Sequence, residues 1–354
     1  MDEKTNLNFH STYKLFKHLD KLCEWDNKGD TYPIMVDIDL TNRCNQKCPL
    51  CIRTEMDKST ISLDKAKDIV LQLKEVGVKS FGLGGGGDPT CHPGFAEILR
   101  FINNTNGMKS GVYTNGYTLS DDLIDTIINC CTYIRISLDA DGPEIYKMTH
   151  GMNAKAFYQV IENIRRLVLL RDKLKKDIVI GVGYLVGPST AKGLYGAVKL
   201  VKELGADYIR VRPFFRYDWE GNYPDAEIEY MLDQLKKCSE LQDKTFAVSY
   251  PQNRWDWMTN IKRERPYKVC YSHHFVTLIG ANQKVYPCCH LSNNEKYCYG
   301  DLKQNTFKEI WNSQKRKDVY KNIDFTDCPN PCMLDGHNRL LWNIRQPVMH
   351  SDFL

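Results

Sequence analysis

The sequence lacks any segment that would place it in or across a membrane. Its first residues, MDEKTNLNFHSTYK, are polar and contain no apolar core of the kind that a signal peptide needs. No stretch approaches the roughly 20 apolar residues that cross a bilayer. We therefore expect a cytoplasmic protein with no membrane partner.

An excess of charge of one sign is absent as well. The chain has 48 basic and 44 acidic residues, a net charge of +4, and no long run of like charge. Such a mixed surface gives no reason to expect nucleic acid as a partner. No low-complexity block interrupts the 354 residues, which suffice for one large α/β domain with an appendage or for two modest domains.

Cysteine, in contrast, is abundant, with 14 residues. Because the cytoplasm is reducing, disulfides are not the expected use of these thiols, and metal or iron–sulfur ligation becomes the leading hypothesis for some of them. Others lie in predicted helices and are most simply small buried hydrophobes: Cys23, Cys130, Cys131 and Cys238.

From residue 34 to about residue 250, short β-rich runs alternate with amphipathic helical stretches. The predicted strands are 35–39, 79–83, 111–114, 133–138, 178–185 and 208–213. Six successive βα units predict a parallel sheet, either an open doubly wound sheet or a full or partial barrel. In both cases the chemistry belongs at the carboxyl ends of the strands. After about residue 250 this rhythm gives way to a hairpin turning near 280–282 and to a small cysteine-centred appendage.

The loop after the first predicted strand carries Cys44, Cys48 and Cys51, spaced C-x3-C-x2-C. A closed zinc site needs four ligands, and the neighbouring residues offer no further cysteine or histidine. Three thiolates on a 4Fe-4S cluster, in contrast, leave one iron open to bind another group. This motif resembles the signature of radical S-adenosylmethionine (SAM) enzymes. The resemblance implies a partial (β/α)6 barrel over residues 34–250, with SAM chelated to the open iron through its methionyl amino and carboxylate groups.

Further motifs extend the resemblance. FGLGGGGDPTCHPGF follows the second strand, where the family has a Gly-Gly-Glu-Pro motif whose backbone holds the SAM amino group, and here Asp replaces the usual Glu. YTNG and RISLDA resemble the family's third and fourth strand ends, and EIYKMTHG has a histidine where many relatives have an arginine that meets the SAM carboxylate. The SAM-binding residues implied are Gly84, Gly85, Gly86, Gly87, Asp88, Asn115, Ser137, Asp139 and His150. For Ser137 and Asp139, capping of the next helix is an equal alternative.

A second set of cysteines, Cys270, Cys288, Cys328 and Cys332, is spread over the C-terminal region. Its pattern resembles the SPASM auxiliary-cluster domain, or the shorter one-cluster form called twitch. The resemblance implies a second 4Fe-4S cluster with these four ligands, and a zinc ion bound by four thiolates is the alternative. Cys289 and Cys298 fit the spacing less well. The expected domains are an N-terminal extension (1–33), the barrel (34–250) and the auxiliary-cluster domain with its tail (251–354).

The resemblance also implies the reaction. A flavodoxin- or ferredoxin-type protein supplies one electron, SAM is cleaved, and the resulting 5′-deoxyadenosyl radical abstracts a hydrogen atom from the substrate. Members that modify peptides often carry a larger N-terminal leader-binding domain than the residues preceding the first strand here. We therefore expect a small-molecule substrate, such as a sugar, aminocyclitol or nucleotide-linked sugar, and its dehydrogenation.

Several alternatives stay open. The enzyme could be a radical epimerase of a sugar-like substrate or a peptide-modifying maturase, and a non-catalytic Fe–S electron carrier is the alternative outside enzymes. Candidate catalytic or substrate-binding residues are Cys91, Tyr184, Arg210 and Arg212. Cys91 is either a thiol facing the active site or a buried one. Arg210 and Arg212 share one face of their strand, which points either into the barrel or into solvent.

Overall fold

The computed structural model describes residues 11–49, 51, 57–214, 223–259, 264–330, 332–347 and 349–350. The described strands form a single sheet of ten strands in the order β10-β9-β8-β1-β2-β3-β4-β5-β6-β7. Their bounds are β1 Met35–Ile38, β2 Ser80–Leu83, β3 Lys109–Thr114, β4 Tyr133–Ser137, β5 Val179–Val186, β6 Tyr208–Pro213, β7 Ala247–Ser249, β8 Val276–Ile279, β9 Lys284–Tyr286 and β10 Gly300–Asp301.

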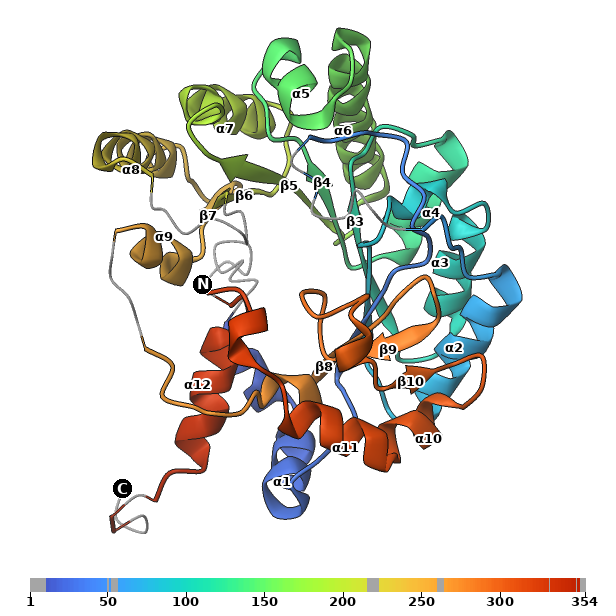
Figure 1. Ribbon diagram of the computed structural model, residues 1–354. Helices are drawn as coiled ribbons and strands as arrows, with labels where there is room; N and C mark the ends of the chain where they lie inside the picture. Colours follow the sequence, from blue (N-terminus) through green and yellow to red (C-terminus); the bar gives the residue numbers. More distant parts are fainter. Residues whose placement is uncertain are drawn as a thin grey trace.

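The first six strands are parallel and follow one another in chain order, which confirms the predicted partial (β/α)6 barrel. Helices cover the outer side of the curved sheet (Figure 1). They are α2 Leu63–Glu75, α3 Phe95–Asn104, α4 Asp121–Cys130, α5 Pro143–His150, α6 Ala154–Leu174, α7 Leu194–Glu203 and α8 Asp225–Ser239. Several begin at a side-chain cap, as when the Ser62, Ser120 and Asn153 side chains accept N–H bonds from the first turns of α2, α4 and α6.

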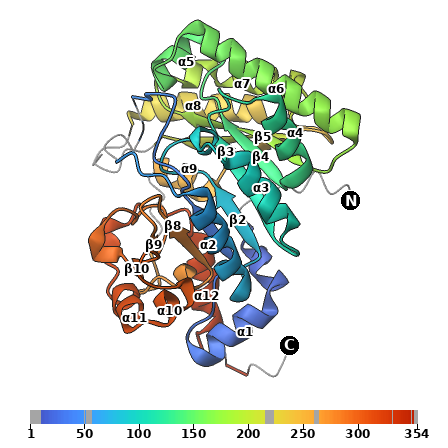
Figure 2. The ribbon, with the colours of Figure 1, turned by 90° about the vertical axis from the view of Figure 1, so that its right-hand side faces the viewer.

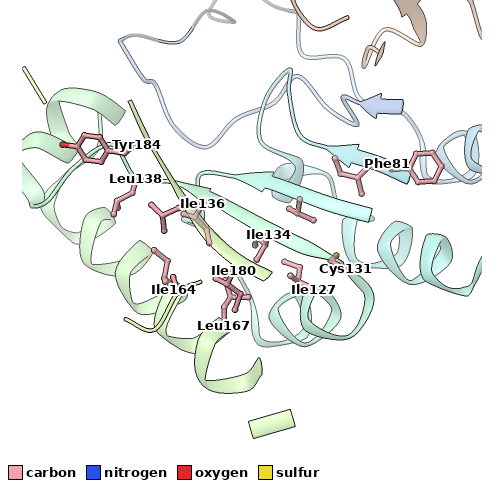
Figure 3. Close-up of a cluster of buried hydrophobic side chains, with 14 of the residues drawn as sticks. Phe81, Ile127, Cys131, Ile134, Ile136, Leu138, Ile164, Leu167, Ile180 and Tyr184 are labelled. Atoms are coloured by element: carbon pink, nitrogen blue, oxygen red, sulfur yellow. The ribbon is translucent and has the colours of Figure 1, made fainter. Parts of the chain in front are cut away.

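The two faces of the sheet differ sharply in character because side chains alternate along each strand. The outer face packs against the helices, and Figure 3 shows Ile134, Ile136 and Ile180 facing Ile164 and Leu167 of α6. The other outward-facing positions of this core are also apolar: Val36, Ile38, Phe81, Leu83, Val112, Val182, Ile209 and Val211.

The inner face of the barrel is polar. In register across the parallel strands, it carries Asp37, Tyr113, Arg135, Ser137, Arg210 and Arg212. Glycines on the same face make room for two large rings. A Cβ at Gly111 would lie 2.1 Å from the Tyr133 ring, and one at Gly181 would lie 2.0 Å from the Tyr208 ring. The interior is therefore a polar chamber with aromatic side chains packed across its strands.

The sheet extends beyond the six predicted strands at both edges. β7 pairs in parallel with β6, and β8 pairs in parallel with β1, so the C-terminal region continues the barrel sheet through main-chain hydrogen bonds. The predicted hairpin is confirmed, since β8 and β9 are antiparallel and the Gly280 N–H donates to the Lys284 carbonyl at 2.9 Å. β10 completes this antiparallel extension.

The remaining helices are α1 Leu19–Lys28, α9 Gln252–Met258, α10 Phe307–Asn312, α11 Gln314–Lys321 and α12 Asp335–Ile344. The N-terminal α1 lies beside the C-terminal region (Figures 1 and 2), and Trp25 packs there with Phe275 and Leu341. Arg316 is fully buried and pairs with Asp30 at 2.6 Å, which joins the same two parts of the chain. Among the described residues, no helix is both long and apolar enough to span a membrane.

Candidate active site

The loop after β1 holds the three clustered cysteines at the carboxyl end of the barrel strands. Cys44 and Cys51 are exposed, and Cys48 is half-buried. Burial, with contributions from the neighbouring Cys44 and Cys51 thiols, raises the pKa of Cys48 to about 12. A cationic iron centre would reverse this effect because it stabilises thiolates. The donor set therefore fits a metal cluster bound by three cysteines.

The glycine-rich segment after β2 packs directly on this cysteine loop. The Gly87 N–H donates to the Thr41 carbonyl at 2.8 Å. A Cβ at Gly87 would lie only 1.9 Å from the Arg43 carbonyl oxygen, and Gly85 has a left-handed backbone with φ of +81°. A side chain at Gly87 would displace the cysteine loop, and one at Gly85 would be strained by the left-handed backbone and would meet the Asp39 side chain. The glycines predicted to hold SAM thus first serve to dock one loop on the other.

Asp88, which replaces the family's usual glutamate, is buried and bonded within the protein. Its carboxylate accepts the Asn115 N–H at 2.7 Å, the Thr114 hydroxyl at 2.9 Å and the Thr90 N–H at 2.9 Å. Burial raises the pKa of this carboxyl group, and the hydrogen bonds oppose that rise. The shorter side chain therefore ties the glycine-rich loop to the end of β3.

Asn115 lies directly beside the first of the clustered cysteines. Its Nδ2 donates to Asn45 Oδ1 at 2.7 Å and lies 3.8 Å from Cys44 Sγ, while its Oδ1 accepts the Tyr117 N–H. The end of β3 is thereby joined to the cysteine loop, as expected for a residue of the cofactor site.

Helix α5 supports the cysteine loop from the other side, a connection that the sequence analysis missed. Gln46 Nε2 donates to the Tyr146 hydroxyl at 2.7 Å in a buried contact. Gly151, which ends the helix with φ of +66°, leaves no room for a Cβ because the Lys47 carbonyl oxygen would lie 2.4 Å away. Sequence offered one signal, a glycine directly after a helix, but not its partner.

Ser137 and Asp139 do not cap the next helix, since α5 begins after Gly142 without a side-chain cap. That alternative was wrong. Ser137 is exposed at the end of β4. Asp139 has a positive φ of 49°, and its carboxylate accepts the Leu185 N–H at 2.6 Å. Burial raises the pKa of Asp139 to about 6, although the Leu185 N–H and Arg212 act to lower it.

His150 is buried, stacks on Tyr146 with ring centroids 4.2 Å apart, and places its Nε2 3.8 Å from Asp139 Oδ2. Burial lowers the pKa of this imidazole to about 4, so it is neutral at pH 7. The position that holds a cation in many relatives therefore carries no permanent charge here.

The four C-terminal cysteines are brought together from distant parts of the chain. Burial raises the pKa of Cys328 to about 12 and that of Cys332 to about 11, and the Cys270 thiol adds to both shifts. Burial likewise raises the pKa of Cys288 well above its usual value, with added effects from Cys332 and Cys270. The Leu334 N–H points at Cys332 Sγ, 3.4 Å away. Such a buried set of thiols fits a cationic centre that binds thiolates.

Cys298 and Cys289 lie outside this set of four in different ways. Cys298 is buried in a small apolar cluster with Leu278 and Tyr286, and its thiol donates to the Gly300 carbonyl. Cys289 neighbours Cys288 and places its Sγ 3.8 Å from the sulfur of Met333. Among the described residues, no three His, Cys, Asp or Glu side chains converge at the distances of a single bound ion.

Comparisons with known proteins match two parts of the chain. The family model of the radical SAM superfamily matches residues 38–185, and that of the SPASM iron–sulfur cluster-binding domain matches residues 270–333. This chain contains a radical SAM domain and a SPASM domain. As a radical SAM enzyme with a SPASM domain, it uses SAM and 4Fe-4S clusters.

Among the relatives of this radical SAM protein is the tungsten-containing aldehyde ferredoxin oxidoreductase cofactor-modifying protein of Pyrococcus furiosus. It is 22% identical over 84% of this chain and 87% of its own length. The dTDP-4-amino-4,6-dideoxy-D-glucose ammonia-lyase of Streptomyces venezuelae is 25% identical over 56% of this chain, which spans 43% of that relative. SuiB of Streptococcus suis, solved with bound SAM, superposes with a TM-score of 0.68 at 12% identity, over 86% of this chain and 72% of that one. SuiB has also been solved with the precursor peptide SuiA.

Cys91 lies at the end of a short 3-10 helix (Pro89–Cys91) in this radical SAM fold. It is half-buried, and burial raises the pKa of its thiol to about 11, with Asp88 and Cys44 adding to the rise. The thiol is thus protonated and near the cysteine loop, and its role as a hydrogen donor stays a prediction.

Tyr184 does not face the interior of the radical SAM barrel. It belongs to the outer core, as Figure 3 shows, and its hydroxyl donates to the Thr190 carbonyl at 2.7 Å. The expectation of a substrate contact overlooked the alternation along β5, where Gly181 and Gly183 occupy the inner face. Arg210 and Arg212 do face inward. Arg210 is 4% exposed, so the solvent-facing alternative is wrong for it.

Proposed function

We propose that Cys44, Cys48 and Cys51 hold a 4Fe-4S cluster and that the enzyme uses the 5′-deoxyadenosyl radical, which SAM supplies there, to take a hydrogen atom from a small polar substrate. The observation that carries this proposal is the docking of the three-cysteine loop on the glycine-rich segment at the carboxyl ends of the barrel strands. Gly87 and Asp88 bind the backbone of the loop from below, with N–H to carbonyl distances of 2.8 and 2.9 Å. A flavodoxin- or ferredoxin-type protein is the proposed electron donor.

The residues around the loop have separate tasks. Gly84 to Gly87 present backbone for the SAM amino group, and Asn115 and Asp139 flank the loop at the ends of β3 and β4. The buried neutral His150 and its neighbour Tyr146 keep water away from the far side. Because His150 is neutral, binding of the SAM carboxylate falls to backbone and other side chains in this protein.

The polar inner face supports a substrate with several hydrogen-bonding groups. Arg135, Arg210 and Tyr113 lie there, below the cysteine loop. A nucleotide-linked sugar fits such a surface, and the Streptomyces venezuelae relative carries a dTDP-sugar in its name. A sugar or aminocyclitol fits by the same reasoning. The second candidate is a peptide, because the SuiB fold has been captured with a precursor peptide.

The outcome that we propose is dehydrogenation. Cys270, Cys288, Cys328 and Cys332 would hold the auxiliary 4Fe-4S cluster, which would supply a one-electron acceptor for the substrate radical. Loss of a hydrogen atom, an electron and a proton from a hydroxyl-bearing carbon leaves a ketone two hydrogens lighter. Epimerisation is the alternative, with Cys91 as the hydrogen donor beside the loop.

The test is anaerobic reconstitution followed by measurement of 5′-deoxyadenosine with candidate sugars, nucleotide-linked sugars and peptides. We expect its formation in wild type and in Cys23→Ala, a matched change of an exposed cysteine on α1. We expect none after Cys44, Cys48 and Cys51 are all changed to alanine, and survival of SAM cleavage there would refute the proposal. In deuterium oxide, a product two mass units lighter supports dehydrogenation, whereas carbon-bound deuterium without mass loss establishes epimerisation.

A further inference from the structure

The inner face of the barrel places arginines of β4 and β6 on either side of two glycines of β5. Arg135 of β4 is in register with Gly181 of β5, and Gly183 of β5 is in register with Arg210 of β6. Glycine places no side chain between the two guanidinium groups. A Cβ at Gly183 would meet only ordinary contacts, the closest being Arg135 Cδ at 3.9 Å. The β5 backbone is therefore open at Gly183, beside Arg210, whereas the Tyr208 ring covers Gly181, beside Arg135.

Arg210 is buried, and no acidic side chain among the described residues pairs with it. Its side chain is 4% exposed, its Nε has no hydrogen-bond partner, and it makes no ion pair among the described residues. Burial, together with the cations Arg135, Arg212 and Arg254, lowers the pKa of Arg210 to about 9. Lys14 is a further cation near it. Buried charges in folded proteins are paired or bind an ion, since an isolated one is costly to desolvate.

Two carboxyl groups of this chamber interact with Arg135 and Arg212 rather than with Arg210. Asp37 lies near Arg135, and burial raises the pKa of that carboxyl group to about 7. Asp139 lies near Arg212 and accepts the Leu185 N–H. Neither acid is among the groups that act on Arg210. The positive charge of the chamber is therefore concentrated around Arg210.

This geometry suits an anion of more than one charge. One guanidinium group can bind both oxygens of a carboxylate. A phosphoryl group has enough oxygens to accept hydrogen bonds from several guanidinium groups at once. Arg135 is already oriented, because its guanidinium lies 4.5 Å above the Tyr113 ring. We propose that Arg135, Arg210 and Arg212 form a subsite on the inner face of the barrel that binds a phosphate or diphosphate group of the substrate. The inference rests on the proposed function, since it assigns an anionic group to the substrate of that reaction.

Titration calorimetry of the reconstituted holoenzyme with SAM present tests the subsite, with pyrophosphate as the probe. We expect wild type to bind pyrophosphate and to bind acetate much more weakly. Arg210→Gln should weaken pyrophosphate binding by at least tenfold, and Arg210→Lys by less, since it keeps the charge but loses the fork. The control Arg165→Gln, an exposed change on α6, should bind as wild type does.

Absence of pyrophosphate binding in wild type, equal binding of acetate, or unchanged binding in Arg210→Gln each overturns the subsite. Loss of SAM affinity in Arg210→Gln with pyrophosphate binding intact would assign the arginines to SAM and also overturn it. A thermal unfolding curve matching wild type shows that the variant is folded, and Arg210→Lys serves if it is not. Formation of 5′-deoxyadenosine in the same preparations judges the proposed function separately: SAM cleavage without pyrophosphate binding refutes only the subsite, and pyrophosphate binding without SAM cleavage refutes only the proposed function.

Discussion

The two cysteine sites of this protein differ in the exposure of their thiols and in how far apart their cysteines lie in the sequence. The first set, Cys44 to Cys51, lies in one short loop and leaves two of its thiols exposed. The second set, Cys270 to Cys332, is assembled from distant segments, and its thiols are at most half-exposed. In the proposed function, the first centre must admit SAM and so needs an open loop, whereas the second centre accepts electrons and is better enclosed. The site with three thiols is the more exposed and the site with four is the more buried, as their proposed roles require.

The sites also differ in what holds them. The loop is bound by neighbours that belong to an independent core, namely the glycine-rich segment, the end of β3 and helix α5. The C-terminal region packs partly on the barrel core, through side chains such as Trp311, and partly in a smaller cluster with the N-terminal helix α1, where Trp25 lies with Phe275. Its four cysteines come from distant segments, which a bound cluster would join. Ligation should therefore matter more for folding in the second site than in the first.

The largest effect should come from removing the loop thiols. Replacement of Cys44, Cys48 and Cys51 by alanine should abolish SAM cleavage and remove about four of about eight bound irons, since each cluster holds four. The unfolding temperature should change little because the barrel core is intact. Iron analysis, 5′-deoxyadenosine assay and calorimetry check these three outcomes. A large loss of stability in this variant would contradict the expectation that ligation matters less for folding in the first site than in the second.

Removal of one auxiliary ligand should instead act on folding. We expect Cys288→Ala to lose the second cluster and to destabilise the C-terminal region by several kcal/mol. Cys298→Ala is the matched control, because that thiol lies in the apolar cluster of Leu278 and Tyr286. Limited proteolysis and iron analysis measure both variants. Equal iron loss in the control would mean that the ligand set is different.

Asp88 tests how strongly the open loop depends on its neighbours. Its carboxylate accepts N–H groups from Thr90 and Asn115, so Asp88→Asn should cost about 1–3 kcal/mol of unfolding free energy. Asp88→Glu, which restores the family's usual residue, should recover only part of that loss because the longer arm must repack. Urea unfolding of the three proteins gives the values, and a neutral Asp88→Asn would show that these bonds do not matter.

The smallest effect concerns pH. His150 has a pKa of about 4 in the folded protein, below the ordinary value of 6.5, so the unfolded chain binds more protons between these limits. Its contribution to stability is complete above pH 6.5 and falls as the pH is lowered toward 4.

Lowering the pH from 7.5 to 5.5 should therefore reduce the stability of wild type relative to His150→Gln by about 1 kcal/mol. Asp139, with its raised pKa of about 6, acts in the opposite direction but is present in both proteins. Urea unfolding at the two pH values measures the difference. A pH-independent difference between the two proteins would mean that His150 titrates normally.

Much of this architecture was predictable because its signals are local. The six central strands and the helices between them carry their own periodicity, and the hairpin has a turn at Gly280. The proximity of the four C-terminal cysteines was also expected from their resemblance to a known pattern.

Other features have no local signal. β7 is only three residues long, and the pairing of β8 with β1 joins segments from opposite ends of the chain. The run VIGVGYLV is apolar on both faces, so the outward position of Tyr184 was not evident from hydrophobicity. Gly181 and Gly183 were the available clue. Side chains alternate along a strand, so Tyr184 must lie on the face opposite to these glycines. The support of the cysteine loop by Tyr146 depends on a contact across a hundred positions of sequence, which no pattern announces.

The pairing of β8 with β1 has a consequence for how the protein folds during its synthesis. During translation β1 leaves the ribosome early, but the strand that covers its outer edge is made only near the end of synthesis. Until then the nascent chain presents an open parallel edge, which invites association with other chains. Closure also brings in Cys270 and Cys288, which flank that hairpin. Iron supply to the cell should thus influence how much newly made protein escapes aggregation, even before any turnover.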